Sequence, residues 1–285
     1  MKKLSLLILS LILALSVVLP LSACGNDGEK PIGETAGLQY TFDDQLGGYA
    51  LTSLNGTSAT EIGIPSKYEG SPVVKVASGV FTSDYAVTKV QLPSSIKVVE
   101  DGAFDSCSTL QNITVLSGNE NYSAKSGVLY NAQGTEFISV PKAIKGEVVL
   151  PDTIKAIPDS QFENRQSITK VVLPEGLETI GDYAFYMCLN LTKADWPSSI
   201  KKVGFAAFYC CKKLKAMFIP GTIEYIGGYA FEGCDTVELT YDGTETQWYD
   251  MLEVAFVDSG LTTQAQEKMY WIRWTAYAPT FLKTA

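Results

Sequence analysis

Residues 181–188 read GDYAFYMC, residues 204–211 read GFAAFYCC, and residues 227–234 read GGYAFEGC. The three stretches begin 23 residues apart, and each has a phenylalanine at its fifth position and a cysteine at its eighth. Self-similarity at a fixed short period is the signature of a repeat architecture. These stretches therefore predict a solenoid, a chain wound into stacked coils of equal length.

The same frame extends through most of the chain. An apolar residue followed by proline precedes each stretch at constant spacing, and Phe104 with Cys107 repeats the pattern upstream. Burying four or five large side chains of one coil gains on the order of 10 kcal/mol, whereas ordering its backbone costs at least about twice that. One coil alone cannot fold, but stacked coils share their inward rows. The apolar–proline pairs are Ile64-Pro65, Leu92-Pro93, Leu150-Pro151, Leu173-Pro174, Trp196-Pro197 and Ile219-Pro220.

These residues resemble the BspA-type leucine-rich repeat of bacterial surface proteins, over roughly residues 60–250. The resemblance implies a leucine-rich-repeat solenoid, β-rich and α/β by class, in which short stacked strands alternate with single helical or 3₁₀ turns. The repeats are expected over residues 64–248. Residues 116–141 break the frame and are expected to form a strand-rich insertion. Its hairpin, with strands at residues 127–130 and 137–140, is expected to bulge from the stack without ending it.

Caps are expected at both ends of the solenoid, because the terminal coils would otherwise expose their cores. Residues 38–63 alternate aromatic and polar side chains around Gly47-Gly48, which favours an N-terminal capping hairpin. Residues 249–285 are aromatic and poorly periodic, and we interpret them as a C-terminal cap or tail of mixed or helical structure.

The N-terminus has the pattern of an export signal. Two lysines precede an apolar run, and residues 1–23 end in Leu-Ser-Ala before Cys24. This ending resembles the lipobox of bacterial lipoproteins, which implies removal of residues 1–23 and lipidation of Cys24. Acyl chains contribute about 0.8 kcal/mol per buried methylene, enough to hold a protein at a membrane. Residues 24–37 would then be a flexible tether, and the remainder would lie outside the cytoplasm, anchored to the membrane or cell surface.

The composition argues against several classes of function. The net charge of −9 disfavours nucleic acid as a partner. The chain has no histidine, the commonest general base and zinc ligand. We find no nucleophile motif, phosphate loop or metal-ligand spacing, and we therefore predict no enzyme activity, no catalytic residue, no metal and no cofactor.

Four cysteines, Cys107, Cys188, Cys211 and Cys234, occupy one column of the repeat, and Arg165 replaces one member. The simplest interpretation is a small buried residue that fills the core. Neighbouring coils about 4.8 Å apart would also bring cysteines within reach of a disulfide, so a bridge between Cys188 and Cys210 or between Cys211 and Cys234 remains an alternative. Metal binding is the third and weakest interpretation, because the CxxC spacing is missing.

The leucine-rich-repeat frame implies which strand residues face outward. Gln91 and Thr114 are among them, together with a lysine column that forms a locally basic stripe on an acidic protein. These lysines either keep the strands soluble or contribute to a recognition surface. The candidate ligand face consists of Lys89, Lys170, Val172, Lys193, Asp195, Lys215 and Phe218.

A second aromatic set lies beside the phenylalanine column, on the turns. Its side chains either pack between adjacent turns or bind a sugar or a protein, because tyrosine offers contact area at little entropic cost. We refer to this set as the aromatic turn patch. It consists of Tyr183, Tyr186, Phe205, Tyr209 and Tyr229.

The functional hypothesis that follows is a membrane-anchored, extracytoplasmic binding or adhesion module. Its partner would be an unknown protein or glycan, such as a component of a host matrix. The alternative is a structural or spacer protein of the cell envelope without a dedicated ligand. Turnover of a cell-wall or host glycan is a distant third hypothesis.

Overall fold

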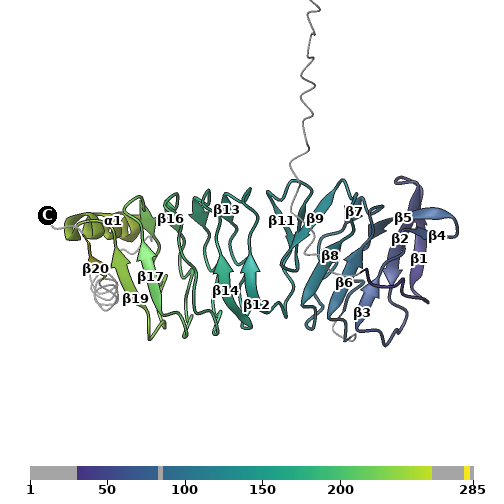
Figure 1. Cartoon of the computed structure of the whole chain (residues 1–285), viewed down its shortest axis with the longest axis horizontal. Coiled ribbons are helices and arrows are strands. Elements are labelled where there is room, and N and C mark those ends of the chain that lie inside the picture. The colour runs from purple at the N-terminus through teal and green to yellow at the C-terminus, as the bar shows by residue number, and fades with distance from the viewer. Residues whose placement is uncertain (1–30, 83–85, 259–278, 283–285) are drawn as a thin grey trace, which may run out of the picture.

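The computed structural model describes residues 31–82, 86–258 and 279–282, with side chains up to residue 251 in the C-terminal helix. The predicted signal sequence, Cys24 and most of the C-terminal tail lie outside these residues. The chain forms an elongated β-rich solenoid whose coils stack side by side along its length (Figure 1). The leucine-rich-repeat fold that the sequence predicts is therefore confirmed.

One parallel ladder of strands, which we call the first ladder, runs along one side of the solenoid. It consists of three separate sheets in which strands from successive coils pair. A bridge between Lys170 and Lys193 continues it across a coil that has no strand there. The first ladder comprises β3 (Glu61–Gly63), β6 (Lys89–Leu92), β8 (Asn112–Val115), β12 (Gly146–Val149), β14 (Ile168–Val172), β17 (Ala216–Ile219), β19 (Glu238–Tyr241) and β20 (Thr280–Phe281).

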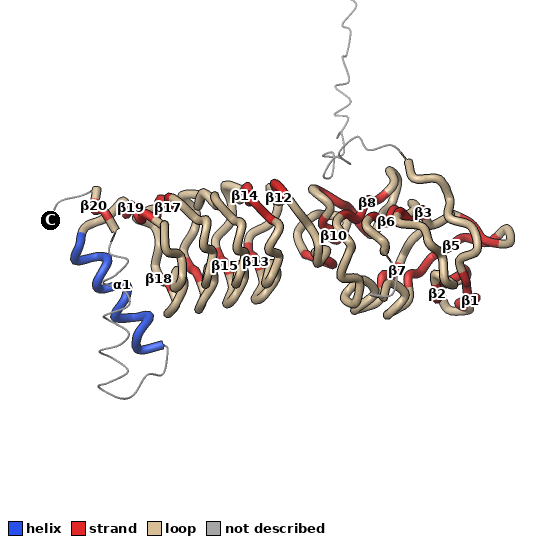
Figure 2. Tube along the Cα trace, turned by 90° about the horizontal axis from the view of Figure 1, so that it is seen from below, coloured by secondary structure: helices blue, strands red, loops and turns tan. Residues whose placement is uncertain are grey.

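A second ladder of shorter parallel strands follows another side of the coils, as the view from below makes clear (Figure 2). In the N-terminal half the equivalent parallel pairs join β2 to β5 and β5 to β7. The second ladder comprises β13 (Ala156–Ile157), β15 (Thr179–Ile180), β16 (Lys202–Val203) and β18 (Tyr225–Ile226), and its N-terminal counterparts are β2 (Gly48–Ser53), β5 (Ser71–Val76) and β7 (Val98–Val99).

The phenylalanine column forms an interior row between the two ladders. The rings of Phe162, Phe185, Phe208 and Phe231 are almost fully buried. Successive ring centroids are 5.1, 5.1 and 5.8 Å apart, and the interplanar angles are at most 16°. Stacking of equivalent rings is the packing on which the predicted fold depends, because each ring shields its neighbours from water.

The glycine at the start of each repeated stretch permits close approach of the turns. A Cβ atom on Gly181 or Gly204 would come within 2.6 Å of a backbone nitrogen in the preceding coil. The same substitution at Gly227 would bring a Cβ within 2.5 Å of the nitrogen of Phe205. Only glycine therefore fits at these three positions.

The insertion at residues 116–141 differs from its expected position. It forms the predicted hairpin, β10 (Val128–Asn131) with β11 (Phe137–Ser139), and adds β9 (Tyr122–Lys125) on the other side of β10. Leu129 is buried in the N-terminal core, whereas Val128 and Tyr130 are buried in the C-terminal core. The expectation that the insertion bulges from the stack is wrong, because alternation along β10 buries both faces of the strand.

Both ends of the solenoid are covered. At the N-terminus β1 (Gln39–Asp43) and β2 form an antiparallel hairpin, and β4 (Lys67–Tyr68) pairs with β5. At the other end the helix α1 (Glu245–Asp258) begins with a capping box, in which Thr244 and Gln247 exchange hydrogen bonds of 2.9 and 3.2 Å. Trp248 of this helix is buried against Tyr241, with ring centroids 5.3 Å apart.

Residues 32–35, within the segment expected to be a tether, are hydrogen-bonded to the solenoid. The nitrogen of Thr35 donates to the carbonyl of Gly63 at 2.8 Å, and the nitrogen of Ile32 donates to Oε1 of Gln91 at 2.9 Å. Glu34 forms a parallel bridge with Gly63. This segment extends the first ladder beyond β3, and residues 32–35 are therefore part of the solenoid.

Candidate binding surfaces

The first ladder carries the candidate ligand face, but its members differ in exposure. Lys193, Asp195 and Lys215 are exposed, and Phe218 is 47% exposed. Lys89, Lys170 and Val172 are half-buried. Because β17 alternates exposed and buried residues, Phe218 points outward beside Ala216 while its neighbours face the core.

Two lysines of the candidate ligand face form ion pairs. The Nζ of Lys170 lies 3.1 Å from a carboxylate oxygen of Glu147, and that of Lys193 lies 2.8 Å from one of Asp195. Glu147 precedes Lys170 by 23 residues, which is one repeat period. Alignment of the sequence at this period therefore places the two residues side by side and predicts the pair. The stripe expected to be basic is therefore partly neutralised.

The expectation that Gln91 and Thr114 are exposed to solvent is wrong, although both lie on the outer face of the first ladder. The two residues are only 3% and 6% exposed. The backbone of Ile32 donates to the Gln91 side chain, and Nε2 of Gln91 lies 3.4 Å from Oγ1 of Thr114. The segment at residues 32–35, which has no apolar period, covers this part of the first ladder.

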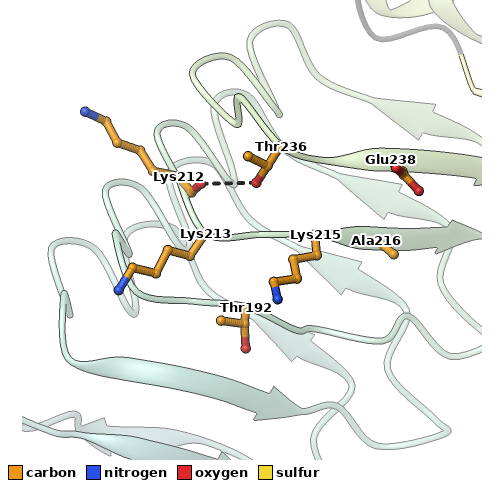
Figure 3. A pocket seen from close by; sticks show the side chains of 7 residues that line it. All are labelled: Thr192, Lys212, Lys213, Lys215, Ala216, Thr236 and Glu238. Carbon is orange, nitrogen blue, oxygen red and sulfur yellow. Dashed lines mark hydrogen bonds between the residues drawn. The ribbon is translucent and has the colours of Figure 1, made fainter.

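An unpaired group of lysines lies near the start of β17. Lys212, Lys213 and Lys215 line a shallow hollow of about 670 Å³ together with Thr192, Ala216, Thr236 and Glu238. Figure 3 shows Lys213 and Lys215 extending toward the side of Thr192, whereas Lys212 extends away from it. Within the described part of the chain none of the three lysines forms an ion pair. We call these three residues the lysine group.

Lys215 belongs to the candidate ligand face predicted from the sequence, whereas Lys212 and Lys213 do not. The run Lys-Lys-Leu-Lys at residues 212–215 was the available signal. The threonines beside the lysine group are occupied by the fold, since Thr236 Oγ1 donates to the carbonyl of Leu214 at 3.0 Å and Thr192 Oγ1 to that of Thr169 at 2.8 Å. The ammonium groups, together with the exposed Ala216 and the carboxylate of Glu238, are therefore the parts of this hollow that are available to a ligand.

The aromatic turn patch is one continuous cluster. Tyr183 is in edge contact with both Tyr186 and Phe205, with centroids 5.7 and 5.5 Å apart. Phe205 continues the row to Tyr229 at 5.2 Å, and Tyr186 stacks on Tyr209 at 5.0 Å. Tyr183 is 39% exposed and the other four rings are half-buried. Packing between adjacent turns, one of the two expected roles, is therefore observed.

The column cysteines are buried free thiols. Each of the three C-terminal members donates a hydrogen bond of 3.1–3.2 Å to the carbonyl of the phenylalanine 26 residues earlier. Burial raises the pKa of the Cys188 thiol to about 12, and a hydrogen bond with Cys234 together with burial raises the pKa of Cys211 well above its usual value. The thiols of Cys188 and Cys211 are thus protonated donors that join adjacent coils.

Arg165 occupies the same column and makes an equivalent contact. Its guanidinium donates to the carbonyl of Val140 at 2.9 Å and to that of Glu163 at 2.8 Å. Burial lowers the pKa of Arg165. The arginine therefore joins the first C-terminal coil to the end of the insertion.

The described residues contain no group of three or more His, Cys, Asp or Glu arranged to hold a metal ion. Among the same residues no helix is long and apolar enough to cross a membrane.

Comparison with known proteins places these features in a family. The model of the BspA type leucine-rich repeat region matches residues 52–147 and 145–259, in six copies. No curated protein matches. Among solved structures, a leucine-rich repeat protein from Eubacterium ventriosum ATCC 27560 is 22% identical with a TM-score of 0.45, and the match covers 68% of this chain and 64% of that one.

Two further solved structures are similar. A leucine-rich repeat protein from Bacteroides ovatus ATCC 8483 is 22% identical with a TM-score of 0.49, over 72% of this chain and 51% of that one. A leucine rich cell surface protein from Faecalibacterium prausnitzii A2-165 is 18% identical with a TM-score of 0.40, over 78% and 98%. The chain thus spans less than two thirds of the first two structures. The family match alone covers more than half of the chain, and the chain belongs to the BspA-type leucine-rich repeat family.

Proposed function

We propose that this protein is an extracytoplasmic, lipid-anchored binding or adhesion module. The family match supports a binding or surface role, and the signal pattern ending at Cys24 supports export and anchoring. The partner is a protein or glycan outside the cytoplasm, such as a component of a host matrix. The lysine group beside the exposed Phe218 is the observation that carries the proposal.

Charge supports an anionic partner at this site. The protein has a net charge of −9, and elsewhere on the ladders Lys170, Lys193 and Lys201 are each within 3.1 Å of a carboxylate. The lysine group has no such neutralising neighbours among the described residues. Lysines that form no ion pair attract anionic surfaces and raise the rate of encounter.

Phe218 adds an apolar contact to this charged site. It lies on β17, three residues after Lys215. It is 47% exposed, which is the largest exposure among the aromatic residues that the structure describes. Aromatic side chains next to cationic ones are typical of interface hot spots. The ring buries apolar surface against the partner, and the cation pairs with a charged group of the partner. The proposed site thus offers both charge attraction and apolar area to one partner.

The test uses the exported chain from residue 25, which retains the docked residues 32–35. Binding to heparin, hyaluronan and poly-L-glutamate is measured by biolayer interferometry. The triple variant Lys212→Gln/Lys213→Gln/Lys215→Gln should lose at least about tenfold in affinity, as should Phe218→Asp. The control Lys155→Gln/Lys201→Gln/Lys202→Gln, which removes the same charge beside the second ladder, should change it less than about twofold.

The outcomes separate the hypotheses. Binding of heparin or hyaluronan alone identifies a glycan partner, and binding of poly-L-glutamate alone identifies an acidic protein. Equal losses in the two triple variants would mean that net charge and not this site governs binding. Failure of the wild-type chain to bind any probe would favour the spacer role.

A further inference from the structure

The aromatic turn patch is built on backbone that aromatic residues rarely adopt. Tyr183 has a φ of 55° and Tyr229 a φ of 59°, both in the left-handed region. For a bulky residue this conformation is an outlier, because the Cβ atom crowds the backbone. Glycine adopts it without steric cost.

The two tyrosines belong to a structural column in which other coils use small residues. Each member lies two positions before the column phenylalanine and has positive φ. The N-terminal coils place glycine here, and only two coils of the C-terminal array place a large side chain. The column consists of Gly79, Gly102, Ser160, Tyr183, Ala206 and Tyr229.

One of the strained tyrosines, Tyr183, is also the most exposed ring of the cluster. Tyr183 is 39% exposed, and Phe205, in edge contact with both Tyr183 and Tyr229, joins them into one row across three coils. Packing alone does not require a ring at this column, because Phe162 and Phe208 are equally buried in coils that carry Ser160 and Ala206 there. Strained residues that the surrounding structure maintains occur preferentially at functional sites.

The chemistry around the row points away from an anionic ligand. The three turn stretches at residues 181–188, 204–211 and 227–234 contain no lysine or arginine. The exposed carboxylates of Asp159 and Asp182 border the row, and each accepts one backbone N–H bond from the next coil through Oδ1, at 2.8 and 2.7 Å. Their second oxygens have no partner among the described residues and are free to accept bonds from hydroxyl groups.

We propose that Tyr183, Phe205 and Tyr229, bordered by Asp159 and Asp182, form a binding site for a neutral polysaccharide. The apolar faces of pyranose rings would lie against the aromatic row, and the carboxylates would accept hydrogen bonds from sugar hydroxyls. A polymer suits the site because the row crosses successive coils at a regular interval. This site differs from the lysine group in position and ligand charge, and it does not depend on the proposed function.

The experiment exploits the backbone conformation. In the exported chain from residue 25, Tyr183→Gly and Tyr229→Gly remove the rings while placing at each position the residue that its φ favours. Ala206→Gly is the matched control, because it makes the same backbone change in the same column without removing a ring. Binding to mixed-linkage β-glucan, xyloglucan, mannan and hyaluronan is measured by affinity gel electrophoresis, and thermal unfolding is measured for every variant.

We expect the wild-type chain to bind at least one of the neutral polysaccharides, with little dependence on salt. The double variant Tyr183→Gly/Tyr229→Gly should lose at least about tenfold in affinity and keep or raise the midpoint of thermal unfolding. Ala206→Gly should bind as the wild type does. The proposal is overturned if no neutral polysaccharide binds, if only hyaluronan binds, or if the double variant unfolds at a lower temperature while its affinity is unchanged.

Discussion

The thiol of Cys211 donates a hydrogen bond to the carbonyl oxygen of Phe185, with 3.2 Å between Sγ and oxygen. The two residues are 26 positions apart and lie in adjacent coils. Cys188 and Cys234 repeat the contact with Phe162 and Phe208. The cysteine that ends each repeated stretch thus connects its own coil to the preceding one, which explains why it recurs at the repeat period.

Protonated, buried thiols should react slowly with alkylating reagents. The chain from residue 25 onward contains five cysteines, of which only Cys210 is half-buried and the other four are buried. Because the thiolate is the reactive form, Cys188, whose pKa is raised to about 12, should be protected at pH 8. Maleimide labelling followed by peptide mass mapping should find Cys210 modified first and the column cysteines only after denaturation. Comparable labelling of Cys188 and Cys210 in the native protein would contradict the assignment.

The phenylalanine row predicts a large difference between two nearby substitutions. Phe208→Ala removes a ring that is fully buried between Phe185 and Phe231, and should lower the free energy of unfolding by about 3–5 kcal/mol. Lys201→Ala breaks only an exposed ion pair with Glu178 and should cost less than about 1 kcal/mol. Urea denaturation measured by tryptophan fluorescence, to which the nearby Trp196 contributes, provides the comparison. Similar losses would argue against the interior row.

The phenylalanine row was predictable because the signal is local and periodic. Every member lies at a fixed distance from an apolar–proline pair, and every member except Phe162 precedes a cysteine by three residues, so one aligned column identifies it. Phe137 was missed, although its ring lies 5.8 Å from that of Phe162 and extends the row into the insertion. The insertion has its own spacing, and a period of 23 residues cannot align it.

The surfaces were less predictable than the core. The burial of Gln91 depends on residues 32–35, which contact the first ladder through backbone hydrogen bonds that leave no pattern in the side chains. The left-handed conformation of Tyr183 was equally hidden, because the column glycines that signal it occur only in the N-terminal coils. Long-range docking and backbone strain are set by tertiary structure and are absent from a repeat alignment.

The left-handed column also predicts the effect of glycine on stability. Ser160 is exposed, has a φ of 55°, and makes no side-chain hydrogen bond among the described residues. Ser160→Gly should raise the free energy of unfolding by about 0.5–1 kcal/mol, since relief of the left-handed strain exceeds the entropic cost of glycine. Ser167→Gly, exposed and with negative φ in the same coil, should instead lower it by about 0.5 kcal/mol. Urea denaturation of both variants tests the prediction, and a loss of equal size at both positions would refute it.

Acid should weaken the contact between the N-terminal hairpin and the first coils. The Nζ of Lys75 lies 3.1 Å from Oδ2 of Asp43 and 2.7 Å from Oε1 of Glu100. The backbone N–H of Leu46 and then Lys75 hold the pKa of Asp43 below its usual value, and Lys75 and then the N–H of Ser78 do so for Glu100. The same contacts, first with Glu100 and then with Asp43, raise the pKa of Lys75.

The sign of the pH effect follows from these directions. A carboxyl group whose folded pKa is depressed stabilises the protein above its unfolded pKa of about 4, and that stability is lost as the pH falls through the folded pKa. Lys75 stays charged throughout this range, because its raised pKa matters only at alkaline pH. Lys75→Gln should therefore unfold at a lower temperature than the wild type between pH 5 and 8, and the difference should shrink below about pH 4. Thermal unfolding followed by circular dichroism from pH 2 to 8 measures it, with Lys201→Gln as a control at an exposed pair. A difference that stays constant down to pH 2 would show that Lys75 stabilises the hairpin by packing and not through its charge.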